Sequence, residues 1–303
     1  MLNLKFLLSL LVVFFSVTLY AQQAPEGTTS ELVILNVTSG EQKTILKESR
    51  HFEAPNWSRD GKYLLINSGG FLEKVALDGN KLGQIQPDKI SRANNDHGIS
   101  FDGKLLVISK SDPDFGSRIY TVPFAGGEPK LITPDHPSYW HGISPDGKTL
   151  VYCAERNDLW DIYSIPTAGG KEKRLTDAEG LDDGPEYSYD GKWIYFNSNR
   201  TGSMHAYRME PDGSGAEQLT DDALDNWFPH PSPDNKSAVI ISYLEDQKGS
   251  HPFGKDVKLR LLNVETKEIK DLTEVFYGGQ GTINVHSWSP DGEWIAFVRY
   301  HKP

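Results

Sequence analysis

The sequence predicts an all-β fold, a six-bladed β-propeller with four-stranded blades whose last blade is closed by the N-terminal strands. A short motif that ends in serine occurs six times, at Ser58, Ser100, Ser144, Ser188, Ser232 and Ser289. The successive intervals are 42, 44, 44, 44 and 57 residues, and an interval near 44 is the length of one four-stranded blade. The composition agrees with many short strands and tight turns, because the 303 residues include 28 Gly and 18 Pro.

Each copy of the motif predicts the same order of strands and turns. The innermost strand ends at the serine, and a Pro-Asp-Gly hairpin follows, as at 145–147, because Pro fixes φ and Gly accepts a positive φ. Residues 192–196 are typical of the second strand, and residues 161–165 of the third. A Gly-Gly or Asp-Gly turn, as at 169–170, then leads to a fourth strand such as 174–176.

The two ends of the chain supply complementary parts of one blade. The sixth copy has only the first two strands before the chain stops at Pro303. Residues 32–37 have the pattern of a third strand and residues 43–46 that of a fourth. We therefore expect residues 31–303 to form a single propeller domain whose sixth blade combines both ends. Such closure hides two sheet edges that could otherwise pair with other chains.

The first residues have the pattern of an export signal. Lys5 gives a basic start, residues 6–18 are apolar, and Ala21 offers a small residue at a cleavage point. A membrane anchor is the alternative, but the apolar run is short against the roughly 20 residues that span a bilayer. We expect a signal peptide at 1–21, a linker at 22–30, a periplasmic or secreted protein, and no membrane span after cleavage.

Charge and cysteine content narrow the range of partners. The formal net charge is −11, and an acidic surface repels nucleic acid and anionic membranes. Cys153 is the only cysteine, so an intramolecular disulfide is impossible even in an oxidising compartment. The sequence has no zinc motif, phosphate loop or basic aromatic run for nucleic acid. We expect a monomer that binds no nucleic acid and suits neutral ligands, cations or basic proteins.

The repeat resembles that of the TolB-like six-bladed propellers, whose pattern is Pro-x-Trp-Ser-Pro-Asp-Gly-Lys, a strand, Arg-x-Gly, a strand, Gly-x and Leu-Thr. The resemblance covers residues 31–300. The resemblance implies the fold but does not select an activity, since the family includes scaffolds, peptidase-associated propellers and some polysaccharide lyases. We expect no counterpart of the N-terminal domain of TolB, which argues against a Tol-Pal role. The absence of Gly-x-Ser-x-Gly disfavours peptidase activity.

Three histidines share one register of the repeat. His97, His141 and His286 each stand three residues before the aligned serine, so we expect their side chains to point toward one end of the channel. Convergent imidazoles beside a carboxylate or amide can hold a divalent cation, and Gln280 lies in the long loop before His286. The alternative is a channel lined by neutral, hydrogen-bonded histidines without a metal.

The same face carries candidate ligand-binding residues. His230 and Glu186 each stand two residues before their aligned serines. Trp140 and Trp227 come shortly before such positions, and flat rings beside carboxylates and amides are typical of sugar-binding surfaces. Packing between adjacent blades is the alternative for both tryptophans.

One interval departs from the period. The 57 residues between the last two serines include two extensions, one at 244–256 and one at 274–284. We expect both on the face of the histidines, beside the channel. Lys255 lies in the most basic stretch of this acidic protein. The first extension could therefore hold an anionic ligand, or it could be surface variation.

Two functions from different classes remain open. The first is an exported, non-catalytic module that binds a glycan or protein ligand on the channel face. The second is a metal-assisted carbohydrate-active enzyme similar to a polysaccharide lyase. In that enzyme, the three in-register histidines would hold a cation against a uronate, and Lys255 or Arg92 would transfer the proton. We favour binding, assign no catalytic residue, and consider a divalent cation in the channel the only candidate cofactor.

Overall fold

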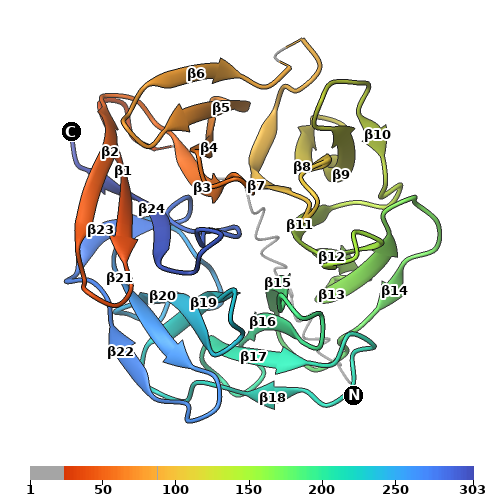
Figure 1. The fold of residues 1–303 in the computed structure, drawn as a ribbon. Helices are drawn as coiled ribbons and strands as arrows, with labels where there is room; N and C mark the ends of the chain where they lie inside the picture. The colour runs from red at the N-terminus through yellow and green to blue at the C-terminus, as the bar shows by residue number, and fades with distance from the viewer. Residues whose placement is uncertain (1–23, 87) are drawn as a thin grey trace, which may run out of the picture.

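Six β-sheets surround a central channel (Figure 1). The computed structural model describes residues 24–86 and 88–303, so the predicted signal peptide lies outside the described residues. The predicted all-β, six-bladed propeller is confirmed. Over the described ranges, no helix is long and apolar enough to cross a membrane.

The first three blades each contain four antiparallel strands in chain order, with the first strand nearest the channel (Figure 1). Blade 1 contains β3 (Glu53–Trp57), β4 (Tyr63–Ser68), β5 (Phe71–Ala76) and β6 (Lys81–Gln84). Blade 2 contains β7 (Ala93–Ile99), β8 (Leu105–Asp112), β9 (Gly116–Pro123) and β10 (Lys130–Leu131). Blade 3 contains β11 (Ser138–Ile143), β12 (Thr149–Arg156), β13 (Leu159–Pro166) and β14 (Lys173–Arg174).

The last three blades repeat this plan with two departures, an added strand in blade 5 and a composite blade 6. Blade 4 contains β15 (Asp182–Tyr187), β16 (Ile194–Ser198), β17 (His205–Met209) and β18 (Glu217–Gln218). Blade 5 contains β19 (Asp225–Pro231), β20 (Ser237–Tyr243), β21 (Phe253–Asn263), β22 (Ile269–Asp271) and the added β23 (Phe276–Gly279). Blade 6 contains β24 (Trp294–His301), β1 (Thr29–Asn36) and β2 (Gln42–Glu48).

Strand β1 joins the two ends of the chain into one sheet. It pairs antiparallel with β24 from Thr29 opposite His301 to Asn36 opposite Trp294, and β2 pairs with its other edge. The innermost place of blade 6 is taken by residues 282–289, which meet β24 through one isolated bridge and a hydrogen bond from Val298 N–H to the carbonyl of Thr282. The blade is therefore built from both chain ends, as predicted, although β1 begins two residues earlier than the predicted domain boundary.

The long fifth interval fastens blade 5 to blade 6. Strand β21 extends beyond its pairing with β22, and β23 supplies hydrogen-bond partners to the free first half of β21. The sequence predicted only a loop in this second extension. The ring of Phe253 packs on Tyr300 with centroids 4.6 Å apart, and Phe276 packs on Phe297 at 5.4 Å. The two extensions thus add apolar contacts at the blade where the ring closes.

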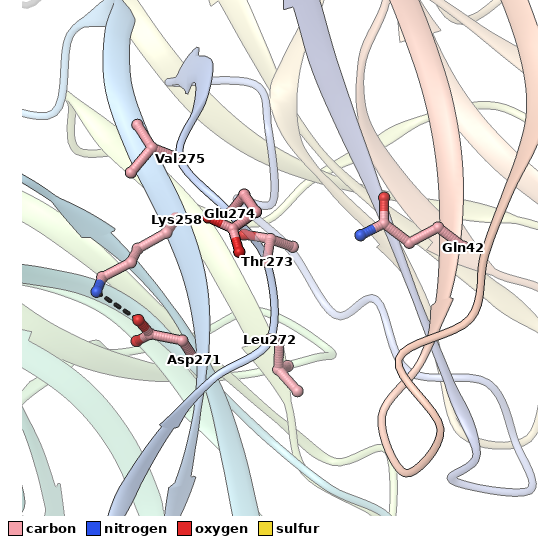
Figure 2. Close-up of a pocket in the computed structure, with 7 residues that line it drawn as sticks. All are labelled: Gln42, Lys258, Asp271, Leu272, Thr273, Glu274 and Val275. Carbon is pink, nitrogen blue, oxygen red and sulfur yellow. Dashed lines mark hydrogen bonds and ion pairs between the residues drawn. The ribbon is translucent and has the colours of Figure 1, made fainter.

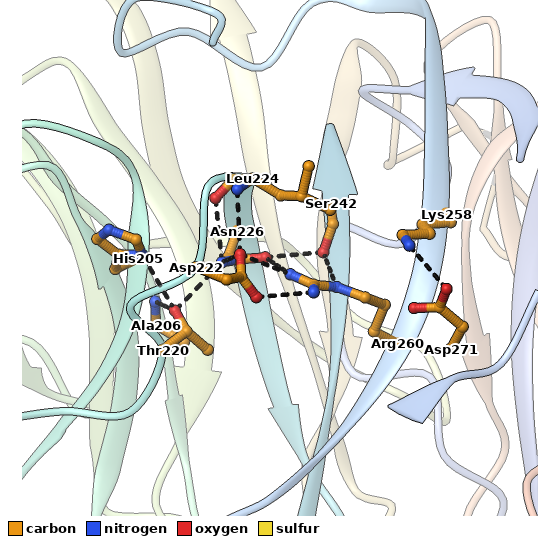
Figure 3. Close-up of polar contacts among 10 residues, drawn as sticks. All are labelled: His205, Ala206, Thr220, Asp222, Leu224, Asn226, Ser242, Lys258, Arg260 and Asp271. Atoms are coloured by element: carbon orange, nitrogen blue, oxygen red, sulfur yellow. Dashed lines mark hydrogen bonds and ion pairs between the residues drawn. The ribbon is translucent and has the colours of Figure 1, made fainter. Parts of the chain in front are cut away.

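A buried arginine ties blade 5 to the loop that enters it (Figure 3). Arg260 in β21 donates to Asp222 Oδ2 at 2.7 Å, to Ser242 Oγ at 2.7 Å, and to Asn226. A buried guanidinium without such partners would be costly. The network therefore fixes the loop between β18 and β19, which leads into the channel.

Bulges interrupt five of the innermost strands. The pairing register shifts between Glu53 and Asn56, Ala93 and His97, Trp140 and Gly142, Asp183 and Glu186, and Trp227 and His230. Ala54 and Phe228 lie within two of these bulges with φ of 52° and 50°, a strained conformation for residues with side chains. Because each bulge changes which side chains face the channel, simple alternation along the strand does not give their directions.

Opening the ring should unfold the protein. We expect deletion of residues 24–48, which removes β1 and β2, to expose the edge of β24 and to cause unfolding or aggregation. Thermal unfolding and light scattering of purified protein measure this. Removal of only Lys302 and Pro303 leaves every β1–β24 pair in place and should leave the melting temperature unchanged. A soluble deletion variant that melts with the wild type would contradict the role of these strands.

The Pro-Asp-Gly hairpins give a second prediction. Gly147 has φ of 72° and no atom within 4 Å of an added Cβ, so Gly147→Ala should destabilise the protein by about 1 kcal/mol through backbone strain alone. The fifth copy already has Asn235 at this position, with φ of 60°. Asn235→Gly should therefore leave the free energy of unfolding within a few tenths of a kcal/mol of the wild type or raise it. Chemical denaturation measures both, and equal effects of the two substitutions would refute the argument.

Candidate functional site

The propeller has two faces, and the channel is closed at one of them. The turn face carries the hairpins that follow the aligned serines, and three of these hairpins replace the proline by Arg59, Phe101 and Tyr189. The guanidinium of Arg59 lies 4.6 Å from the centre of the Phe101 ring, and Phe101 meets Tyr189 edge to face at 5.3 Å. Side chains from blades 1, 2 and 4 meet in this way only across the channel. These three residues therefore form a plug at the turn face.

Side chains also fill the channel behind the plug. The cavity beside Arg59, Phe101, Glu186 and His286 has a volume of about 20 Å³, which has room for about one water molecule. A larger hollow of about 300 Å³ lies on the outside of the ring, where Gln42 of β2 faces the end of β22 (Figure 2). The cavity beside the plug is therefore too small for a sugar ring.

Glu186 bridges two histidines in the middle of the channel. Its carboxylate accepts hydrogen bonds from His230 Nδ1 at 2.6 Å and from His286 Nδ1 at 2.9 Å. Burial acts to raise the pKa of Glu186, but the two imidazoles outweigh it and lower this pKa to about 2. Glu186 is therefore an ionised carboxylate near neutral pH.

The two histidines beside Glu186 have different partners on their other ring nitrogen. His286 Nε2 faces the Tyr189 hydroxyl at 2.8 Å and the Arg59 guanidinium at 3.0 Å. Burial and the charge of Arg59 lower the pKa of His286, so this imidazole is neutral and its Nε2 accepts. His230 Nε2 instead faces the carbonyl oxygen of Ile283 at 2.8 Å. Both ring nitrogens of His230 therefore lie next to acceptor oxygens, one of a carboxylate and one of a carbonyl.

A second carboxylate, Asp183, holds two histidines nearer the opposite face. His141 Nε2 lies 3.3 Å and His251 Nε2 lies 3.5 Å from its oxygens. Burial acts to lower the pKa of His141, but the hydrogen bond to Asp183 and the charges of Asp96 and Asp183 raise it to about 9. His141 Nδ1 faces the carbonyl oxygen of Asn284 at 3.3 Å, which also requires the imidazolium form. The sequence had not singled out His251, which comes from the first extension.

These histidines hold the backbone of the irregular innermost segment of blade 6. The carbonyls of Ile283 and Asn284 contact His230 and His141, and Asn56 Nδ2 donates to the carbonyl of His286 at 2.9 Å. Because this segment makes a single bridge to β24, side chains of other blades supply hydrogen bonds that a regular strand would provide.

The three predicted metal ligands do not form a metal site in the described residues, although His141 and His286 line the same small cavity. His141 pairs with Asp183 and His286 with Glu186, whereas His97 is fully buried and its ring nitrogens have no hydrogen-bond partner in the described part of the chain. Burial lowers the pKa of His97 to about 4. Within residues 24–86 and 88–303, no group of three His, Cys, Asp or Glu side chains is arranged to hold a metal ion. The bulges and the backbone carbonyls that bind the imidazoles explain why a shared register did not produce a shared site.

The predicted ligand-binding residues also lie apart. Trp140 and Trp227 are 2% and 0% exposed and pack in the core, so neither ring presents a face to a ligand. Lys255 is exposed on β21, Gln280 is half-buried, and Arg92 is exposed before β7. His230 and Glu186 do meet, but as a buried ion pair inside the filled channel.

Comparison with known proteins identifies the family of this propeller. A family model of the TolB beta propeller domain matches residues 136–302, more than half of the chain. The chain belongs to the TolB β-propeller family. The resemblance inferred from the repeat is thereby confirmed.

Relatives of this TolB-family propeller agree with the assignment. An uncharacterized protein of Agrobacterium fabrum is 47% identical over 277 residues, which are 89% of this chain and 92% of that protein. A solved structure from Agrobacterium tumefaciens, provisionally named TolB, is 45% identical with a TM-score of 0.86, over 91% of this chain and 99% of that one. TolB from Acinetobacter baumannii is 19% identical with a TM-score of 0.63, over 84% of this chain and 65% of that one, and shows the shared fold alone.

The mouth face of this TolB-family propeller, opposite the turn face, carries a group of aromatic and apolar side chains that are exposed or half-buried. We name it the rim patch, and it consists of Phe115, His136, Tyr139, Leu159 and Trp160, from blades 2 and 3. Phe115 and Leu159 are 43% and 47% exposed at the tips of two hairpins. Phe115 meets His136 with ring centroids 5.4 Å apart, and Tyr139 meets Trp160 at 5.9 Å. The signal in the sequence was an apolar residue at each hairpin tip, where polar residues are usual.

The ion pair of His141 and Asp183 makes stability depend on pH. The pKa of His141 is raised from 6.5 to about 9 in the folded protein, so its contribution is fully present below about pH 6.5 and is lost as the pH rises through about 9. The raised pKa corresponds to about 3 kcal/mol at most. His141→Gln should therefore destabilise the protein more at about pH 6 than at about pH 10.

Denaturant unfolding at both pH values measures this difference. His136→Gln, which changes an exposed histidine outside the channel, is the matched control and should alter stability equally little at both. A His141→Gln penalty that does not change with pH would mean that the imidazolium form is wrongly assigned.

Proposed function

We propose that this TolB-family chain is an exported, non-catalytic binding module that captures a protein partner on its mouth face. The observation that carries this proposal is the contrast between the two faces. The turn face is plugged by Arg59, Phe101 and Tyr189, and the channel behind the plug is filled. The mouth face carries the rim patch, so a ligand docks there and does not pass through the ring.

The chemistry of the rim patch suits a protein. Aromatic and large apolar side chains are typical of the centre of protein interfaces, where they supply most of the binding energy. The patch spans two blades, because Gly116 of one hairpin lies beside Pro137 in the segment that enters the next blade. Rigid hairpins hold these side chains in place, which lowers the entropy cost of binding.

A glycan is the less favoured ligand. Sugar recognition needs exposed ring faces beside free carboxylates and amides, and the two tryptophans that the sequence offered for this role are buried. The metal-assisted lyase likewise gains no support, because a protonated imidazole cannot bind a cation and His141 is held in that form by Asp183.

The proposal includes the compartment and the oligomeric state. Residues 6–18 are apolar after a basic start, which favours export to the periplasm or beyond. A single chain closes its own ring through β1 and β24, so a second copy is not needed to cover these sheet edges, and the proposal is a monomer.

Site-specific photo-crosslinking in the source cells tests the docking face. A benzoyl-phenylalanine at position 115 and another at position 159 should each crosslink to the same protein. The matched control is position 82, because Leu82 is 55% exposed on the outer strand β6, far from the mouth. Adducts at 82 equal to those at 115 and 159, or no adduct at either rim position, would argue against the proposal.

The isolated complex then gives a quantitative prediction. Trp160→Ala removes a half-buried ring of the rim patch and should weaken the affinity for the crosslinked partner by about tenfold or more, as loss of an aromatic anchor does. Isothermal titration measures the affinity. Leu82→Ala should leave it unchanged, and the melting temperature of each variant shows that the fold is intact.

A further inference from the structure

Most buried carboxylates of this protein have a cationic partner. Glu31 binds Arg299, Asp182 binds Arg200, and Asp183 and Glu186 bind histidines. Such pairing is the rule, because a buried charge without a partner is strongly disfavoured. Asp225 accepts only the backbone N–H groups of Met204 and Gln247. Two further carboxyl groups, Glu53 of β3 and Asp96 of β7 on neighbouring innermost strands, also lack an ion-pair partner of this kind.

Glu53 stands at the mouth without a cation. Its side chain is 18% exposed, and the nearest basic group is His51 Nε2 at 3.9 Å. Burial lowers the pKa of His51 to about 4, so this imidazole is neutral near pH 7. Burial, together with the charge of Asp96, raises the pKa of Glu53 to about 8. Because no positive charge lies beside it, the Glu53 carboxyl group is largely protonated near pH 7.

Asp96 on the neighbouring strand β7 forms no direct ion pair in the described residues, although the charge of His141 acts on it. It is 4% exposed, and its carboxylate accepts a hydrogen bond from Asn94 Nδ2 at 3.0 Å. Burial raises the pKa of Asp96 to about 6. The charge of Asp183 adds to this shift, while His141 and His251 oppose it.

An unpartnered hydroxyl group lies beside Glu53. Tyr300 is 2% exposed, and its Oη has no hydrogen-bond partner among residues 24–86 and 88–303. Tyr300 and Glu53 both lie against Gly281, where an added Cβ would stand 2.5 Å from Tyr300 Oη and 2.7 Å from Glu53 Oε2. Gly281 also has φ of 87°. The unpartnered Tyr300 hydroxyl and the Glu53 carboxyl group therefore both lie next to Gly281. Any larger residue at this position would clash with them.

We propose that Glu53, Asp96 and Tyr300 form a subsite that binds one cationic group, the ammonium or guanidinium of a lysine or arginine side chain of a protein partner. This inference rests on the proposed function, since it names what the partner inserts at the mouth. The cation supplies the charge that the two carboxyl groups lack, and the Tyr300 oxygen accepts a hydrogen bond from it. The −11 net charge of the chain favours the approach of such a partner.

Binding at this subsite is coupled to proton release. The groups that face Glu53 are His51 from the loop before β3, Asp96 of β7 and Tyr300 of β24, and Asp96 in turn faces Asp183, His141 and His251. A cation attracts ionised carboxylates and not neutral carboxyl groups. Affinity therefore rises as the pH passes through the pKa values of Asp96 and Glu53, about 6 and about 8.

Carbon-13 NMR of the carboxyl groups of the full chain, labelled in glutamate, tests the subsite with small probes. The Glu53 signal is assigned with Glu53→Gln. N-methylguanidinium and ethylammonium should shift this signal saturably and lower the apparent pKa of Glu53 by about one unit, a tenfold change in proton affinity. Binding should be at least about tenfold tighter at pH 9 than at pH 6. N-ethylacetamide, a neutral probe of similar size, should produce no saturable shift.

Matched variants complete the test. Tyr300→Phe keeps the ring and removes the hydroxyl, and it should weaken probe binding about tenfold, as loss of a hydrogen bond to a charged group does. Glu265→Gln alters an exposed carboxylate on a distant turn and should change nothing. Equal responses to the cationic and neutral probes, or a response that survives Glu53→Gln, would overturn the subsite. Crosslinks at the rim patch without a cation response refute the subsite alone, whereas a cation response without crosslinks refutes the proposed function alone.

Discussion

The pairing of β1 with β24 is the contact on which the rest of this structure depends. Each blade packs against two neighbours, so the ring holds its shape only while all six interfaces exist. Eight residue pairs join the two ends of the chain, and the two extensions add Phe253 and Phe276 against β24 of the same blade. Closure also fixes the diameter of the channel. The contacts of Arg59 with Phe101, and of Glu186 with two histidines, depend on that diameter.

The fold could be predicted because its determinants are local and repeated. Six serines in phase, each before a tight turn, define strand boundaries without knowledge of any distant contact. The composite sixth blade could be predicted because the last copy of the motif lacks a third and a fourth strand. The extra strand β23 could not be predicted, because it exists only to pair with the free half of β21, a distant partner. Cross-strand pairing of this kind leaves no signal within a short segment.

The site could be predicted only in part. The sequence identified the residues that line the channel, but not which of them meet. A shared register places residues at equal heights only in regular strands, and bulges in five innermost strands remove that regularity. The plug was detectable in principle, since Arg59, Phe101 and Tyr189 stand where the motif has proline. A deviation from a repeat is therefore more informative about a site than the repeat itself, because the shared residues serve the fold that all blades have in common.

The order of the paired strands also determines how the ring responds to force. The N-terminal residue of β1, Thr29, lies opposite the C-terminal residue of β24, His301. A pull that separates the two ends of the chain therefore loads these hydrogen bonds one pair at a time, starting at the outermost pair, and does not load all eight together in shear. The strands peel apart as a zipper does, which requires less force than sliding them past each other. A propeller tethered at one terminus keeps its ring intact, whereas one held at both termini opens first at blade 6.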